Sequence, residues 1–108
     1  MSTPDREPSG AEKMFGDFAP GLVHFTDDVL FGEVWKRSQL SAKERSLVTV
    51  AVLPTNGNTD QLVYHLGLAK ENGNTEEELI EALTHLAFYA GWPQAMAAMA
   101  AAKKVFTG

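Results

Sequence analysis

The sequence predicts an all-α fold for this chain of 108 residues. Capping boxes, in which a Ser or Thr is followed three residues later by a Glu, precede apolar segments at Ser41 and Thr75. Apolar residues then recur at intervals of three and four, which is the spacing of one helix face. The run LVTVAVL alone resembles a strand, but it follows a capping box and has no turn signal before Pro54, so we expect it to be helical.

The beginning of the chain is polar. We expect residues 1–12 to form a disordered tail, because their Pro, Ser, Glu and Gly residues offer little apolar surface to offset the entropy lost on ordering. Residues 13–108 then form one domain, a length that suits a single core. Pro20 suits the first turn of a helix that continues to Gly32, and the segment 31–40 suits a short helical connector.

Two helices follow in the middle of the chain. The first begins after Ser41, is apolar on nearly every side and should end at Pro54. The second opens at Asp60 and should end before Gly73; its buried stripe is expected to contain Leu62, Leu66 and Ala69. A helix that is apolar all round must be buried, and a chain this short has little surface to cover it. We therefore expect subunits to cover it for one another.

Two more helices complete the chain. The helix capped by Thr75 has apolar residues at helical spacing, which we expect to face the core: Leu79, Ile80, Leu83, Leu86, Ala87 and Ala90. The last helix has Pro93 at its start, and its alanines at 95, 98 and 102 allow another helix to approach closely. We predict about six helices in all, packed as a helical-hairpin core with the LVTVAVL helix at its centre.

Composition excludes several classes of function. The net charge is −5 and no Lys/Arg cluster exists, which argues against binding to nucleic acid or to an anionic membrane. Cysteine is absent, so no disulfide, thiolate nucleophile or cysteine-based metal site can form. The N-terminus has no apolar signal region, and the longest apolar runs are shorter than the roughly 20 residues that cross a bilayer. We expect a cytoplasmic protein.

His65 is the principal candidate for chemistry. It lies at the edge of the buried Leu62 and Leu66 stripe, and the facing helix brings Glu44 and Arg45 toward it. A purely structural imidazole at the edge of the core is the competing interpretation. The other histidines are weaker candidates: we expect His85 to face solvent or a neighbouring subunit. No metal is expected, because the histidines lack a His-x-x-x-His or Glu-x-x-His spacing.

Two stretches carry a resemblance to a known family: FGEVWKRSQLSAKERSLVTVAVL and VYHLGLAKENGNTEEELIEALTHLAFYAGWPQAMAA. They resemble the carboxymuconolactone decarboxylase family, part of the alkylhydroperoxidase D-like superfamily. The resemblance covers roughly Phe15 to Phe106. It implies an alkylhydroperoxidase D-like helical fold and an oligomer, most simply a hexamer built as a trimer of dimers.

The peroxidase branch of that superfamily does not fit this chain. It has a C-x-x-C motif ahead of a histidine, and the equivalent positions here are Asn58 and Gln61. It also has a glutamate directly before the apolar helix, where this chain has Ser46. Without a thiolate, no sulfur can attack a peroxide bond. The decarboxylase branch is matched better, by the KERS sequence at residues 43–46.

The resemblance implies a cofactor-free decarboxylation of 4-carboxymuconolactone to the 3-oxoadipate enol-lactone. Loss of CO₂ pushes electrons into a conjugated carbonyl, and the resulting dienolate needs a donor at oxygen and an acid at carbon. His65 suits the acid, and Glu44 beside it could fix its tautomer. Arg45 or Arg37 could pair with a substrate carboxylate in fork geometry.

Three aromatic residues are expected to line the pocket: Trp35, Tyr89 and Trp92. Trp92 would narrow the pocket, so the substrate could differ from the carboxylactone. Two alternative functions stay open. One is a family member linked to peroxide defence through a partner protein, and the other is a non-catalytic oligomer that binds a small ligand.

Overall fold

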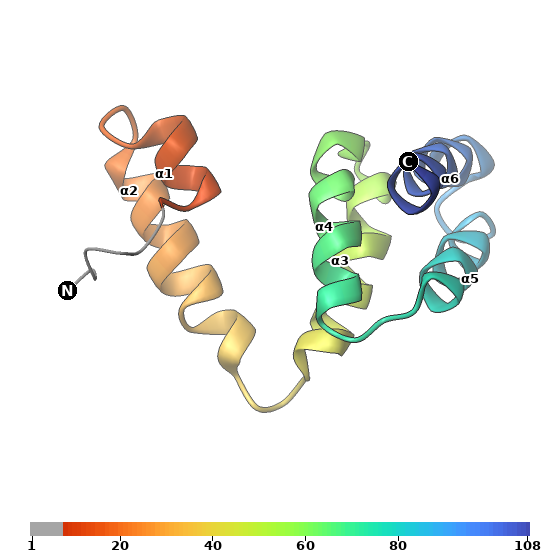
Figure 1. Ribbon diagram of the computed structural model, residues 1–108, viewed down its shortest axis with the longest axis horizontal. Helices are drawn as coiled ribbons and strands as arrows, with labels where there is room; N and C mark the ends of the chain where they lie inside the picture. Colours follow the sequence, from red (N-terminus) through yellow and green to blue (C-terminus); the bar gives the residue numbers. More distant parts are fainter. Residues whose placement is uncertain (1–7) are drawn as a thin grey trace. The chain divides into compact units, whose positions relative to one another are not determined.

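The computed structural model describes residues 8–108, which form six α-helices and no strand, as predicted (Figure 1). The chain divides into an N-terminal unit (Met1–Gln39) and a C-terminal unit (Leu40–Gly108). Most of the expected tail, residues 1–7, lies outside the described residues. Helix α1 (Gly10–Phe15) begins before the expected start at residue 13, because Ser9 and Glu12 form a capping box that the sequence interpretation overlooked.

The N-terminal unit continues with helix α2 (Pro20–His24), which runs directly into the π-helical segment η1 (Phe25–Phe31). The predicted helix from Pro20 to Gly32 is therefore present, but its second half has wider turns. A short 3₁₀ segment, η2 (Val34–Lys36), supplies the expected connector. None of these helical segments contains a buried residue, so residues 8–39 form no closed core among themselves.

The C-terminal unit opens with a helical hairpin. Helices α3 (Ala42–Thr55) and α4 (Thr59–Glu71) lie side by side in opposite directions (Figure 1). The capping box at the start of α3 is formed as predicted. Pro54, expected to end the helix, lies inside its last turn instead. The chain leaves the helix at Gly57, whose φ of 78° is easily adopted only by glycine.

Helices α5 (Glu76–Leu86) and α6 (Trp92–Thr107) complete this unit. Helix α6 packs on α4 and α5, and its alanines at 95, 98 and 102 are buried as the small-residue pattern predicted. Leu62, Leu66 and Ala69 of α4 are completely buried, which confirms the predicted stripe. Ile80 was expected in the core but is 41% exposed, because it lies about 100° around α5 from Leu79.

Helix α3 is not buried on every side. Val50 and Ser46 face the interior, whereas Leu47, Val48 and Val52 are 36%, 56% and 47% exposed. A single chain therefore leaves part of α3 uncovered, as expected, although the described helices α4, α5 and α6 pack against it. Cover by other subunits stays a prediction.

Two further findings concern residues 8–108. No helix there combines the length and apolar character needed to cross a membrane. No three His, Asp or Glu side chains in this part of the chain lie close enough together to hold a metal ion. Candidate sites in the described residues must therefore be built from other combinations of side chains.

Candidate functional site

Helix α3 packs against α4 with one face and against α5 with another, so two candidate sites flank it. We call the first the hairpin seam, defined by Arg45, Ser46, His65 and Asn72. We call the second the α3–α5 groove. Its lining residues are Ser41, Lys43, Glu44, Leu47, Val48, Ala51, Asn74, Glu77, Glu78, Glu81, Ala82, His85, Leu86 and Tyr89.

A side-chain hydrogen bond joins helix α3 to the end of helix α4 at the hairpin seam. The amide Nδ2 of Asn72 donates to the completely buried hydroxyl of Ser46, at 2.9 Å. His65 precedes Asn72 by seven residues, about two turns of an α-helix, so both lie on the same side of α4. Because Asn72 contacts Ser46 of α3, we place His65 on the side of α4 that faces α3.

The environment of His65 favours its neutral form. The side chain is half-buried, and this burial lowers the pKa of the imidazole. The ring of Tyr64 meets it edge-on, with the ring centroids 5.1 Å apart. At neutral pH the ring is therefore mostly uncharged, so it can donate or accept a hydrogen bond according to its tautomer.

Arg45 supplies the positive charge of the seam. It is half-buried and directly precedes Ser46, which faces α4. Leu47 lines the α3–α5 groove, and a step of two residues turns about 160° around the helix axis. Arg45 therefore points away from Leu47, about 100° around α3 from Ser46 and about 60° from Val48, which also lines the groove. Its guanidinium carries several fixed donors that suit a carboxylate.

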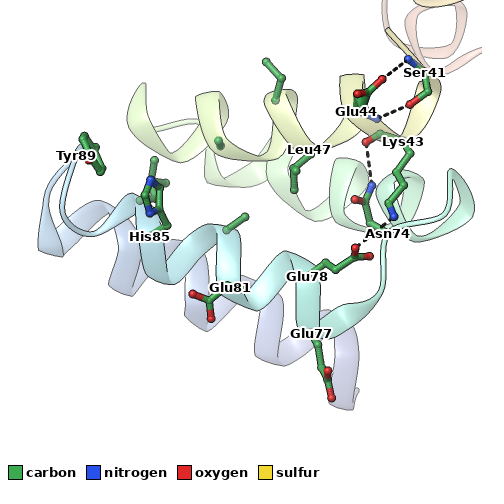
Figure 2. Close-up of a pocket in the computed structure, with 14 residues that line it drawn as sticks. Ser41, Lys43, Glu44, Leu47, Asn74, Glu77, Glu78, Glu81, His85 and Tyr89 are labelled. Atoms are coloured by element: carbon green, nitrogen blue, oxygen red, sulfur yellow. Dashed lines mark hydrogen bonds and ion pairs between the residues drawn. The ribbon is translucent and has the colours of Figure 1, made fainter.

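The α3–α5 groove is large and has an apolar floor. Its volume is about 1180 Å³. Five apolar side chains from the two helices form the floor: Leu47, Val48, Ala51, Ala82 and Leu86. Figure 2 shows Ser41, Lys43, Glu44, Asn74 and Glu78 at one end of the groove and His85 and Tyr89 at the other. The groove thus has a charged end and an aromatic end.

The charged end is strongly acidic. Four glutamates and one lysine are among the lining residues of the groove. Hydrogen bonds from Ser41 lower the pKa of Glu44, and hydrogen bonds from Thr75 and Lys43 lower the pKa of Glu78. The ammonium of Lys43 pairs with Glu78 at 3.2 Å. These carboxylates stay ionised at neutral pH, so the groove repels anions.

Asn74 joins the hairpin to the groove. It is 4% exposed, and its Nδ2 donates to the carbonyl oxygens of Lys43 and Ala69, each at 3.1 Å. The chain reaches this position through Gly73, whose φ is 108°. The sequence interpretation did not single out Asn74. The signal was present, since Gly73 at a helix end predicts a Schellman motif and Asn74 is its next residue.

The structure divides the predicted site residues between these places. Arg45 directly precedes Ser46 on α3 and His65 lies about two turns before Asn72 on α4, whereas Glu44 and Tyr89 line the groove. Glu44 uses its Oε1 to accept from the backbone N–H of Ser41 at 2.8 Å. His65 is not among the residues that line the groove with Glu44. The catalytic role of Glu44 stays a prediction.

Three other predicted residues belong to other helical elements. Trp92 is the first residue of α6, is 59% exposed and packs edge-on against Phe88, at a centroid distance of 5.5 Å. Trp35 and Arg37 belong to the N-terminal unit, where the Trp35 ring stacks on Phe31 at 5.6 Å. A role for these residues in substrate binding stays a prediction.

The sequence interpretation did not predict that His85 lines a groove. This histidine is exposed, as expected, but it also lines the groove and its ring lies 4.8 Å from that of Tyr89. The two residues are four apart, a spacing that places them together on a continuing helical path. Only the packing of α3 against α5 shows that this side of α5 borders a groove.

Comparison with known proteins agrees with the resemblance seen in the sequence. The profile of the carboxymuconolactone decarboxylase family matches residues 20–104. The chain is 43% identical over 90 residues to a 4-carboxymuconolactone decarboxylase of Acinetobacter baylyi, covering 83% of this chain and 67% of the relative. It is 38% identical over 74 residues to nitrosuccinic acid decarboxylase npaB of Metarhizium robertsii, covering 68% of this chain and 52% of that relative. Both relatives are named decarboxylases, which supports a carboxy-lyase type of enzyme in general.

Proposed function

The chain belongs to the carboxymuconolactone decarboxylase family, and we propose that it is a cofactor-independent decarboxylase of a small carboxylated lactone such as 4-carboxymuconolactone. We place the reaction at the hairpin seam, with His65 as general acid and base. The observation that carries this assignment is the opposite charge of the two candidate sites. The seam holds a guanidinium and an imidazole, whereas the groove holds four glutamates.

The charge of the substrate decides between the two sites. A carboxylated lactone is an anion at neutral pH, and two unit charges 4 Å apart interact by about 4 kcal/mol at an effective dielectric constant of 20. Several fixed carboxylates in the groove would oppose its entry. Arg45 would attract it, and the planar guanidinium suits two parallel hydrogen bonds to one carboxylate.

The proposed reaction needs only proton transfer and charge stabilisation. The C–C bond to the leaving CO₂ breaks, and its electron pair moves through the ring into the conjugated carbonyl to form a dienolate. The positive charge of Arg45 stabilises the developing negative charge. An imidazole N–H of His65 then delivers a proton to carbon, and His65 recovers this proton from solvent. One proton is taken up for each CO₂ released.

The half-buried position of His65 suits this role. Burial favours the neutral ring in the free enzyme. A bound carboxylate favours the protonated ring, so substrate binding itself would bring a proton to His65. The remaining predictions stand on the family resemblance and not on the geometry of the seam: Trp35, Arg37, Tyr89 and Trp92 as substrate-binding residues, a cytoplasmic location and a self-associating enzyme.

The test is the loss of the lactone's ultraviolet absorbance, together with CO₂ release. The wild-type chain should consume 4-carboxymuconolactone without added metal or cofactor. His65→Gln should reduce kcat by about 10²- to 10⁴-fold, the range for loss of a general acid. His85→Gln is the matched control, since this exposed histidine belongs to the groove. Equal activity of His65→Gln and the wild type would remove His65 from the mechanism.

Arg45 is tested separately. Arg45→Gln should raise KM more than it lowers kcat if the guanidinium mainly holds a substrate carboxylate. Arg45→Lys keeps the charge but loses the fork geometry, so it should recover part of the affinity. Unchanged KM and kcat in both variants would contradict a contact between Arg45 and the substrate.

The second relative favours a second candidate substrate, nitrosuccinic acid. It is also a small carboxylic acid, and the nitro group could accept the electron pair as a conjugated carbonyl does. The same assays with this substrate decide which acid the chain prefers. If the folded wild type decarboxylates neither acid, the non-catalytic, ligand-binding alternative gains support.

A further inference from the structure

The α3–α5 groove leaves apolar surface uncovered, and neither His65 nor Arg45 is among its lining residues. Val48 on its floor is 56% exposed and Tyr89 at its aromatic end is 80% exposed. The groove volume of about 1180 Å³ exceeds the roughly 300 to 1,000 Å³ of most small-ligand pockets. An open apolar channel between two helices is the kind of surface that receives a third helix.

The charge of the groove specifies the character of such a helix. Its charged end carries Glu44, Glu77 and Glu78, and Glu81 lies one turn further along α5. The described lining residues offer Lys43 as the balancing cation, and its ammonium is paired with Glu78. An occupant should therefore present apolar or small side chains along the floor and positive charge at the glutamate end.

Helix α6 of this same sequence has such a face. Its solvent-exposed residues include Trp92, Met96, Ala97, Ala100, Lys103 and Lys104. Met96 is 64% exposed, and the alanines that follow allow a close helix approach. Lys103 and Lys104 form a pair of adjacent cations, and no carboxylate of residues 8–108 forms an ion pair with either. The face is thus apolar at one end and basic at the other.

We propose that the α3–α5 groove of one chain receives the exposed face of α6 from a second copy of this chain. Lys103 and Lys104 would meet the glutamate end, and Met96 and Trp92 would meet the aromatic end. The lengths agree. Glu77 to His85 and Met96 to Lys104 each span eight residues of helix, which is about 12 Å at 1.5 Å per residue.

This arrangement is favoured over a symmetric contact of groove with groove. In a symmetric contact, the glutamates that line both grooves would add like charges to one interface. Groove and α6 are two different surfaces, so their contact is heterologous and repeats from chain to chain until it closes a ring. The contact contains neither His65 nor Arg45, so assembly can be measured separately from decarboxylation.

Reciprocal charge reversal tests this contact. One variant carries Glu77→Lys and Glu81→Lys in the groove, and the other carries Lys103→Glu and Lys104→Glu on α6. Neither pair includes Glu44 or Glu78, which cap their helices. Each variant alone should lose the self-association seen for the wild type in sedimentation velocity, by at least about tenfold in apparent affinity.

An equimolar mixture of the two variants is the decisive sample. In the mixture each groove can pair with an α6 of opposite charge, so the assembly should return. Glu71→Lys, which changes an exposed α4 glutamate outside the groove, should assemble like the wild type. If a double variant does not fold by circular dichroism, the single exchange of Glu81→Lys with Lys103→Glu replaces it.

Three results would overturn the proposal. The first is a wild-type chain that stays monomeric at high micromolar concentration. The second is unchanged assembly in both charge-reversed variants, which would place the contact on another face. The third is failure of the mixture to reassemble although both variants are folded, since the two faces would then not meet each other.

Discussion

The hairpin seam and the α3–α5 groove share helix α3 but differ in burial and in charge. The seam joins Ser46 to Asn72 through a buried hydrogen bond and carries Arg45 and His65, both half-buried. The groove is open, and four glutamates are among its lining residues. The comparison shows that adjacent residues of one helix can face surroundings of different burial and charge, which suit different kinds of binding. We assign the binding of an anion to the seam and the contact with a second chain to the groove.

The difference arises from single-residue steps along α3. Each step turns the side chain by about 100°, so Arg45, Ser46 and Leu47 point to three different surroundings. Ser46 meets α4, Leu47 meets the groove, and Arg45 lies on the remaining flank. Four comparisons can break or sharpen this contrast.

The largest expected effect compares a side chain in the hairpin interior with one on the groove floor. Leu66 is completely buried, so Leu66→Ala should lower the free energy of unfolding by about 3 kcal/mol. Leu47 is 36% exposed, and Leu47→Ala should cost less than about 1 kcal/mol. Urea denaturation followed by circular dichroism measures both values. Equal losses would show that the groove floor is as tightly packed as the hairpin.

The second effect concerns Asn74, which connects the two regions. Asn74→Ala removes the amide that serves two carbonyl oxygens and should cost about 2 kcal/mol. Asn74→Asp should be at least as damaging, because a carboxylate oxygen would face the same carbonyl groups. Denaturation of both variants checks this expectation. A harmless Asn74→Asp would mean that the side chain does not bridge the helix ends.

A smaller effect is expected at the helix cap beside the groove. Ser41→Ala removes the hydroxyl that accepts from the backbone N–H of Glu44 and should cost about 1 kcal/mol. Glu44→Gln retains an acceptor for the Ser41 N–H, so it should cost only a few tenths of a kcal/mol. Thermal unfolding of the two variants measures the difference. The reverse order would show that charge, rather than capping, stabilises this helix start.

The smallest effect is the pH dependence contributed by His65. Burial lowers its pKa in the folded chain below the unfolded value of about 6.5, so the unfolded chain binds more protons. Its contribution to stability is therefore complete above pH 6.5 and decreases as the pH falls through the folded-state pKa. His65→Gln should lose less stability than the wild type between pH 7.5 and about 5.5.

The same titration tests the sign of the pKa shift. The lowered pKa values of Glu44 and Glu78 affect stability only at more acidic pH, below the ordinary glutamate value of about 4.3. The wild-type and variant curves should therefore diverge before these carboxylates titrate. A wild type that gains stability relative to His65→Gln on acidification would show a raised pKa instead.

Much of the local structure could be predicted from sequence. The capping boxes at Ser41 and Thr75 determine where two helices begin, and Gly73 determines where α4 ends. These signals act over a few residues, so they need no knowledge of the rest of the fold. Two predicted helix boundaries were wrong. Helix α1 begins at Gly10 because Ser9 and Glu12 form a capping box, and α3 continues through Pro54, which was expected to end it.

The candidate site could be predicted only in part. His65 was placed correctly at the edge of the buried stripe of α4, because the positions of Leu62 and Leu66 define that stripe. The sequence does not determine which α3 side chains accompany His65, since that depends on which side of α3 faces α4. Helix α3 is apolar on nearly every side, so its hydrophobic pattern contains no information about that direction.

The amino-acid sequence by itself therefore determined the helices, their caps, the buried stripe of α4 and the absence of thiol chemistry. Only the tertiary structure decided that α3 turns Ser46 toward Asn72 and Leu47 toward a groove bordered by α5. The physical reason is the distance along the sequence over which each kind of interaction acts. Capping and helical periodicity act between residues three or four apart, whereas the groove depends on side chains more than 30 positions apart that meet only when the helices pack.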